Sequence, residues 1–218
     1  MMDSDMIFFN DRFLRRQRCF DGASELISCQ FDRDNGQVPQ LHHARTYVER
    51  WDQMRLRGLG LLFWGPPGTG KTFAAACIAN YFLESRESFV PTVVMTTLGV
   101  VLQKVLALNP QDRDVYLQGL QQADLLILDD FGMERQTEFA REQVFNIING
   151  RYLSSKPMII TTNLTLQQLR SPQTMSDHRI SDRVLEVCVP VCFEGESLRK
   201  ARAAENLRFY RDLAASSC

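Results

Sequence analysis

The feature that most constrains this chain is a glycine-rich stretch of eight residues that matches the pattern G-x-x-x-x-G-K-[ST] at every fixed position. It follows a short apolar run and precedes a stretch with helical periodicity, where a phosphate-binding loop must lie. Glycines let the backbone turn its N–H groups inward, and the N-terminus of the following helix favours anions. We therefore predict a nucleotide phosphate site formed by Gly65, Pro66, Pro67, Gly68, Thr69, Gly70, Lys71 and Thr72.

Two side chains of this loop have definite expected tasks. Lys71 is expected to reach the β- and γ-phosphates, and the Thr72 hydroxyl is expected to ligate magnesium. The alternative is a loop of glycines and prolines that only turns the chain. The position between a strand and a helix disfavours that alternative.

After the loop, short apolar runs alternate with helical stretches. Strands are predicted over 59–64, 92–96, 124–128, 157–161 and 187–191, and helices over 41–57, 71–85, 98–108, 112–122, 138–153, 179–185 and 197–213. Strands that are apolar on both faces predict a parallel sheet covered by helices on both sides. We expect the strand that begins near Leu59 to be central, flanked by the neighbourhood of the strand at Leu125.

Composition narrows the class of protein. The chain has 218 residues, of which 44% are hydrophobic and 23% charged, which argues against a disordered or fibrous protein. Its 25 basic and 26 acidic residues give a net charge of −1, so any contact with nucleic acid must come from a local patch. The apolar runs fall far short of the roughly 20 residues that span a bilayer. No secretory signal is evident, and we expect a cytoplasmic protein without a membrane segment.

The six cysteines form no C-x-x-C pair, and we interpret them as reduced, small buried residues. The alternative is a zinc site that combines Cys19 and Cys29 with His42 and His43. Its spacing fits no common zinc pattern.

Residues 1–40 differ in composition from the rest of the chain. They contain a basic cluster from Arg12 to Arg18, a turn-rich stretch over 32–36, and Pro39. We expect an arm or linker over 1–40 with little core of its own, followed by one domain over 41–218.

A second set of polar residues follows two of the predicted strands. Asp129 and Asp130 end an apolar run, so Asp129 is placed beside magnesium and Asp130 can polarise a water for attack on the γ-phosphate. One of the two acids could instead only cap the following turn. Asn163 follows the next strand, at the sheet edge where ligands bind in open α/β folds, although an asparagine there is often a simple turn residue.

Arg179 and Arg183 lie four residues apart and share one face of a predicted helix. They either meet an anionic group or form a solvated face, with Asp177 or Asp182 as possible ion-pair partners.

Together these segments resemble the AAA+ ATPases, and more closely the DnaC-type replicative helicase loaders and the IstB-type transposition ATPases. The resemblance covers about residues 41–200. It is carried by the segments 65–72, 125–135, 143–152, 161–164 and 179–183. It implies an α/β P-loop NTPase fold of three layers, with a five-stranded parallel sheet and without a large C-terminal lid domain.

The resemblance also implies roles for single residues. Asn163 would be the sensor residue, and Arg183 the arginine finger that reaches a neighbouring subunit's nucleotide, with Arg179 as the alternative. Arg199 is a candidate second sensor. Loaders usually have Glu where this chain has Asp130, and this departure predicts slow turnover.

The implied function is an ATPase that binds ATP or ADP with Mg2+ and loads a replicative helicase onto single-stranded DNA as a homo-oligomer. Lys104, Arg113 and the Arg12–Arg18 cluster could line a DNA channel, or they could be solvated surface charges. Helicase loaders usually carry an N-terminal domain that grips the helicase. Here about 40 residues precede the core, which predicts either a core fragment or a reduced arm. Two alternatives remain: an IstB-like transposition ATPase that acts on duplex DNA, and a scaffold that binds ATP with little hydrolysis.

Overall fold

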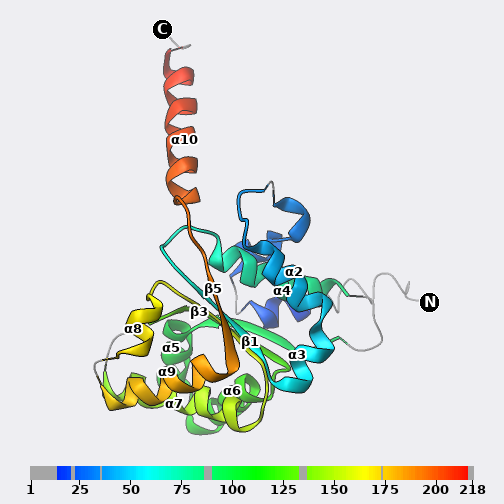
Figure 1. Cartoon of the computed structure of the whole chain (residues 1–218), viewed down its shortest axis with the longest axis vertical. Coiled ribbons are helices and arrows are strands. Elements are labelled where there is room, and N and C mark those ends of the chain that lie inside the picture. The colour runs from blue at the N-terminus through cyan, green and yellow to red at the C-terminus, as the bar shows by residue number, and fades with distance from the viewer. Residues whose placement is uncertain are drawn as a thin grey trace, which may run out of the picture.

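The chain forms a parallel β-sheet between two layers of helices in the computed structural model (Figure 1). The structure describes residues 14–20, 23–34, 36–85, 90–132, 137–172 and 174–215. The strands are β1 (Gly60–Trp64), β2 (Val93–Thr97), β3 (Leu125–Phe131), β4 (Met158–Thr162) and β5 (Cys188–Cys192). Their order across the sheet is β2-β3-β4-β1-β5, and every neighbouring pair is parallel. The predicted five-stranded parallel sheet is therefore confirmed.

The prediction that the strand beginning near Leu59 is central was wrong. The central strand is β4, whereas β1 lies between β4 and the edge strand β5. The strand at Leu125 is separated from β1 by β4. Local apolar character gives no information on strand order, because order depends on how the helical crossovers pack.

Beyond the helical turn over 14–19, nine α-helices and two short 3-10 helices are assigned within the described residues. The α-helices are α2 (Leu41–Glu49), α3 (Trp51–Arg57), α4 (Lys71–Glu84), α5 (Leu98–Ala107), α6 (Pro110–Gln122), α7 (Glu138–Leu153), α8 (Leu166–Arg170), α9 (Met175–Val187) and α10 (Leu198–Ala215), and the 3-10 helices are η1 (Ser24–Ser28) and η2 (Phe31–Arg33). The single predicted helix over 41–57 is two helices, broken at Arg50 and ended by Gly58 in the left-handed region. The short helix α8 was not predicted; five residues are too few to show a periodicity.

Alternate residues of each strand supply the two cores. Leu61, Phe63, Ile127 and Ile159 pack with α2, α4 and the segment before them, whereas Leu62, Leu126, Leu128 and Ile160 pack with α5, α7 and α9. The inner strands are buried on both faces, as a parallel sheet covered by two helical layers requires.

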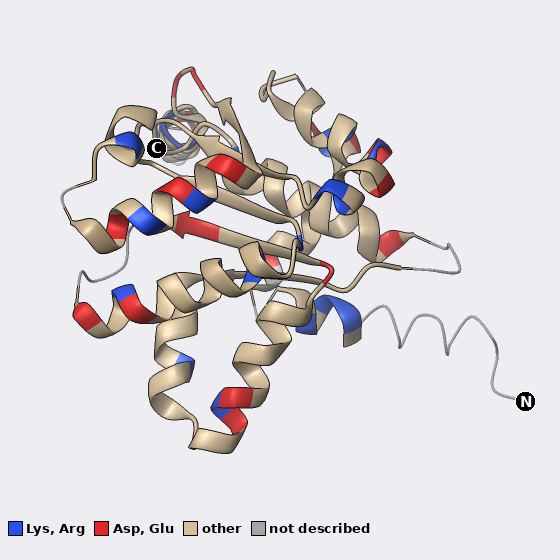
Figure 2. Ribbon diagram, turned by 60° about the horizontal axis from the view of Figure 1, so that its bottom comes forward, with Lys and Arg blue, Asp and Glu red and all other residues tan. Residues whose placement is uncertain are grey.

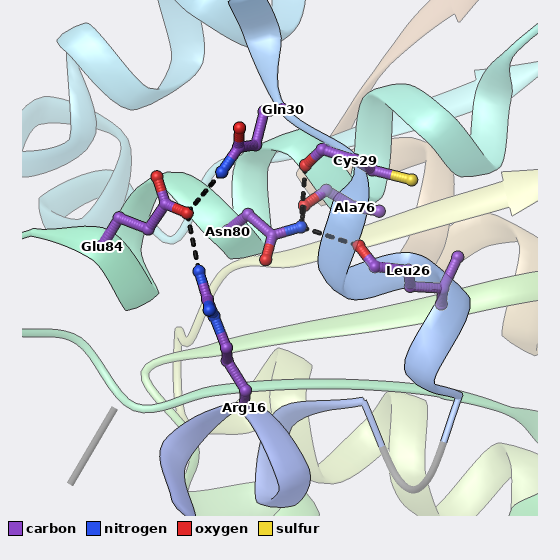
Figure 3. A network of polar contacts seen from close by, with 7 residues as sticks. All are labelled: Arg16, Leu26, Cys29, Gln30, Ala76, Asn80 and Glu84. Carbon is purple, nitrogen blue, oxygen red and sulfur yellow. Dashed lines mark hydrogen bonds and ion pairs between the residues drawn. The ribbon is translucent and has the colours of Figure 1, made fainter. Parts of the chain in front are cut away.

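Hydrogen bonds and an ion pair connect the segment before residue 40 to helix α4 (Figure 3). The Asn80 side-chain amide, in the middle of α4, donates to the carbonyl oxygens of Leu26 and Cys29, each at 2.8 Å. At the end of α4, Glu84 accepts from Arg16 at 2.7 Å and from Gln30 at 2.6 Å. Further members of this segment join the α4-side core: Cys19, Phe20, Phe31 and Val38. The division into an arm over 1–40 and a domain over 41–218 stays a prediction.

A fully buried arginine of α7 lies at the end of the sheet away from the P-loop and connects α7 to the segments before β3 and β4. The Arg151 guanidinium donates to main-chain carbonyls at the end of α6 and in the segment that follows it, and to the carbonyl of Pro157 before β4. Burial lowers its pKa to about 10. Arg151 thus donates to carbonyl groups at the end of a helix that would otherwise need water as a hydrogen-bond donor.

Helix α10 leaves the body and projects beyond it (Figure 1). Its side chains from Arg199 to Ala214 are all exposed, and Leu207, Phe209, Tyr210 and Leu213 are among the large apolar residues that face solvent. No large lid domain follows β5 in the part of the chain that the structure describes, as predicted.

Candidate nucleotide site

The glycine-rich loop joins β1 to the N-terminus of α4, as predicted. Gly70 has φ +99°, and a Cβ there would lie 2.8 Å from a methyl group of Val38. Gly68 has φ +83°, and a Cβ there would lie 2.2 Å from the Ser197 hydroxyl. Positive φ and close neighbours both require glycine, and they pack the loop between the segment before α2 and the start of α10.

The Lys71 ammonium group is held within this loop. It is 5% exposed and donates to the carbonyl oxygens of Gly65 and Pro66, each at 2.7 Å. Burial lowers its pKa, while the neighbouring Asp130 and Asp129 act in the opposite direction. The group is therefore a buried cation beside two acids, which is the charge arrangement that a polyphosphate and a divalent metal ion require.

Asp129 and Thr72 meet although 57 residues separate them in the sequence. The Thr72 hydroxyl donates to both carboxylate oxygens of Asp129, at 3.0 and 3.1 Å. The Thr161 hydroxyl donates to the same carboxylate at 2.6 Å. Burial raises the pKa of Asp129, the hydrogen bonds from Thr161 and Thr72 act to lower it, and Asp130 adds to the increase.

The donor set fits magnesium. A hydroxyl and a carboxylate, in contact at the mouth of a phosphate loop, are hard oxygen ligands of the kind Mg2+ prefers. Thr72 and Asp129 would hold the ion, which when bound would neutralise charge on the β- and γ-phosphates.

Asp130 and Asn163 reach the same pocket from neighbouring strand ends. The pocket has a volume of about 190 Å³, and its wall includes Lys71, Thr72, Asp130, Asn163 and Arg199. Asp130 is exposed and lies in the left-handed region with φ +54°. Five side chains that were proposed from four separate segments are thus brought to one place.

Helix α10 contributes more to the pocket than the sequence indicated. The Leu198 N–H donates to the carbonyl of Gly68 at 2.9 Å, and Leu198 and Arg199 both line the pocket. Arg199 was only a minor candidate, because an arginine on a helix is usually solvent-facing. The sequence feature that indicates this contact is the position of Arg199 shortly after Gly195, in the break between the last strand and the final helix.

Arg183 does not line this pocket. It lies on α9, where its guanidinium stands over the ring of Phe145 at 5.0 Å and near the ring of Tyr152 at 5.6 Å. It donates to the carbonyl of Arg179 at 3.1 Å, and the Arg179 side chain is exposed. The pair does share α9, as the spacing predicted, but it lies outside the nucleotide pocket of its own chain.

The zinc alternative finds no support in the described residues. Within them, no three His, Cys, Asp or Glu side chains gather where they could hold a metal ion. The rings of His42 and His43 contact each other with centroids 3.8 Å apart, whereas Cys19 is buried in the core as a free thiol. Cys218 lies outside the described residues.

Comparison with known proteins agrees with this geometry. A family model described as "IstB-like ATP binding protein" matches residues 40–206. The chain belongs to this IstB-like family of ATP-binding proteins. In Escherichia coli K12, the uncharacterized protein YdaV is 29% identical over 154 residues, and the replicative helicase loader DnaC is 26% identical over 181 residues. These matches cover 70% and 80% of this chain, and 58% and 71% of the relatives.

A crystal structure of the DnaC helicase loader has the same fold. Its TM-score is 0.62 at 25% identity, and the match covers 79% of this chain and all of that one. The family, the fold and these relatives identify the chain as a DnaC-type or IstB-like AAA+ protein, which confirms the resemblance found in the sequence.

Charge on the surface is mixed. In Figure 2 acidic and basic residues are interspersed along the helices. Among the residues proposed to contact DNA, Arg16 pairs with Glu84 and the Lys104 ammonium lies 4.9 Å from the ring centroid of Tyr116. Arg12 lies outside the described residues. In the described part of the chain, none of the helices combines the length and the apolar character needed to cross a membrane.

Proposed function

We propose that this protein is an ATP-dependent loader that assembles on a ring-shaped replicative helicase and helps to place it on single-stranded DNA. The observation that carries the proposal is the pocket in which the phosphate loop meets Asp130, Asn163 and Arg199, in a chain similar to the helicase loader DnaC. ATP and Mg2+ are the proposed ligands, and the cytoplasm is the proposed location.

The pocket residues have proposed roles in hydrolysis. Lys71 binds the β- and γ-phosphates, and the N–H groups of the loop and of the α4 N-terminus add further donors. Asp130 polarises the attacking water, and Asn163 orients it from the neighbouring strand. Because Asp is one methylene shorter than Glu, Asp130 holds the water less closely, which predicts slow turnover.

The arginine finger is proposed to act between copies. The position of Arg183 outside the pocket of its own chain supports contact with the nucleotide of a neighbouring subunit. The rings of Phe145 and Tyr152 restrict the orientation of its guanidinium. A long side chain that is already ordered loses less conformational entropy when it binds a partner. Arg179, which is exposed on the same helix, is the alternative finger.

DNA binding is proposed to require the assembled form. A chain of net charge −1 lacks the charge for strong non-specific affinity. Lys104, Arg113 and the Arg12–Arg18 cluster are the proposed DNA contacts of the assembled form. Single-stranded DNA would then bind the oligomer tightly and the monomer weakly.

A second function remains a candidate because the matching family model is named for IstB-like proteins. In that case the same site would serve a transposition ATPase that acts on duplex DNA. A third reading is a scaffold that binds ATP but barely hydrolyses it.

The test is co-elution of the full chain with the replicative helicase of its host, with ATP and without nucleotide. We expect ATP-dependent co-elution with wild type and its loss with Lys71→Ala. ATP turnover is measured in parallel, alone and with single- or double-stranded DNA. No helicase binding, together with stimulation by duplex DNA only, would favour the transposition ATPase. Turnover at background level under every condition would favour the scaffold.

A further inference from the structure

Asp129 and Asp130 are consecutive residues of β3, and both belong to the nucleotide site. A regular strand would direct their side chains to opposite faces of the sheet, because successive side chains of a strand alternate. Leu125 and Ile127 face the α4 side and Leu126 and Leu128 face the other, so Asp129 belongs to the α4 side and Asp130 would belong to the opposite core. Asp130 nevertheless lines the nucleotide pocket.

A bulge in β3 resolves this conflict. Leu128 pairs with Ile160 and Phe131 pairs with Thr162, so β3 advances three residues where β4 advances two. The additional residue is Asp130, with φ +54°. Phe131 then takes the place in the α7-side core that regular alternation would give to Asp130. Bulges of this kind redirect side chains near functional sites.

One hydroxyl touches both acids at this bulge. Thr161 is fully buried in the central strand β4. Its hydroxyl donates to Oδ1 of Asp129 at 2.6 Å and accepts from the N–H of Asp130 at 3.0 Å. The hydrogen bond from the Asp130 N–H therefore holds a residue whose positive φ is uncommon outside glycine, although aspartate tolerates it better than most residues.

We propose that Thr161 is a positioning residue of the ATPase: its hydroxyl fixes Asp129 beside Thr72 and holds the bulge that turns Asp130 toward the nucleotide. The inference rests on the proposed ATP site. In the sequence, Asn163 was interpreted as the sensor residue of this segment, and Thr161 had no role of its own. The proposal gives Thr161 a separate role. Packing alone would not require the hydroxyl, because valine has nearly the same shape.

The test compares Thr161→Val, which removes the hydroxyl but keeps the shape, with Thr161→Ser, which keeps the hydroxyl. Loss of a group that orients a metal ligand typically costs about 10- to 100-fold in metal affinity or activity. We therefore expect kcat for ATP to fall by roughly that factor in Thr161→Val, and the Mg2+ concentration for half-maximal turnover to rise. Thr161→Ser should stay within about threefold of wild type.

Binding of a fluorescent ATP analogue supplies a readout that does not depend on hydrolysis. In Thr161→Val the affinity without Mg2+ should equal that of wild type, because the phosphate loop is unchanged, while the gain in affinity on adding Mg2+ should shrink by about tenfold. If Thr161→Val does not fold, Thr161→Ala, which introduces no larger group, takes its place.

Unchanged kcat and unchanged Mg2+ dependence in a folded Thr161→Val would overturn the proposal, as would a Thr161→Ser variant as impaired as Thr161→Val. If wild type itself does not hydrolyse ATP, the proposed ATPase activity fails. The Mg2+-dependent binding of the analogue then still decides the role of Thr161.

Discussion

Asn80→Ala should release the segment before residue 40 from helix α4. Asn80 is 1% exposed, and its amide is the main polar tie between α4 and residues 26–29. The substitution removes the hydrogen bonds to Leu26 and Cys29, together with one inside α4 to the Ala76 carbonyl, and leaves the backbone of α4 unchanged. Its effect therefore measures how strongly this segment stabilises the fold.

The size of the effect follows from the partners. Each of the two hydrogen bonds lost between α4 and the segment contributes about 1 kcal/mol net. The Leu26 carbonyl still accepts from the Cys29 N–H, so only the Cys29 carbonyl loses the single partner seen here. Alanine is a better helix former than asparagine by roughly 0.5 kcal/mol, which offsets part of the loss. We expect the free energy of unfolding to fall by about 1.5–2 kcal/mol.

Urea denaturation followed by circular dichroism measures this free energy, and amide hydrogen exchange over residues 23–34 shows where protection is lost. For a chain of this size the expected decrease in Tm is about 4–7 °C. Gln103→Ala, an exposed position on α5, is the matched control and should change the stability by less than about 0.5 kcal/mol. Equal stability of Asn80→Ala and the control, with unchanged exchange over 23–34, would refute the reasoning.

Four further substitutions probe the site and the frame that holds it. Lys71→Ala should weaken ATP binding roughly 100-fold or more in a calorimetric titration, because two charge-assisted phosphate contacts are lost; unchanged affinity would contradict the assigned site. Asp130→Asn should keep ATP affinity and lose turnover in a phosphate-release assay, since Asp129 and Thr72 are untouched; normal turnover would place water activation elsewhere. Arg183→Ala should lower turnover about 10³-fold or more with nucleotide binding intact, and should regain activity when mixed with Lys71→Ala subunits; co-assembled mixtures that stay inactive would exclude action in trans. Arg151→Met should lower the free energy of unfolding by about 3–5 kcal/mol in urea, because several buried carbonyls lose a charged hydrogen-bond donor; a loss below about 1 kcal/mol would show that water replaces it.

The phosphate loop and the five strands could be predicted from the sequence because their signals are local. A fixed pattern between an apolar run and a helix specifies Lys71 and Thr72 without knowledge of the rest of the chain. Asp129, Asp130 and Asn163 could be placed as well, since parallel strands end at one edge of the sheet.

The parts that could not be predicted depend on contacts between distant segments. The order of β1 and β4 follows from crossover packing, and the burial of Phe31 and Val38 depends on α4, which lies tens of residues further along the chain. The break at Arg50 lies within an unbroken apolar periodicity. Thr161 was visible only as part of a motif, because its two partners lie on another strand.

The central claim is that this ATP site drives the loading of a ring helicase, and loading onto a closed circle tests it most directly. A ring cannot thread onto circular single-stranded DNA, so the amount of helicase retained on the circle reports opening and placement. With wild-type protein and ATP we expect the host's replicative helicase to be retained on the circle and to unwind an annealed strand, and we expect Lys71→Ala to give only the level of helicase alone. Retention at the level of helicase alone with wild-type protein, or equal retention with Lys71→Ala, would contradict the account.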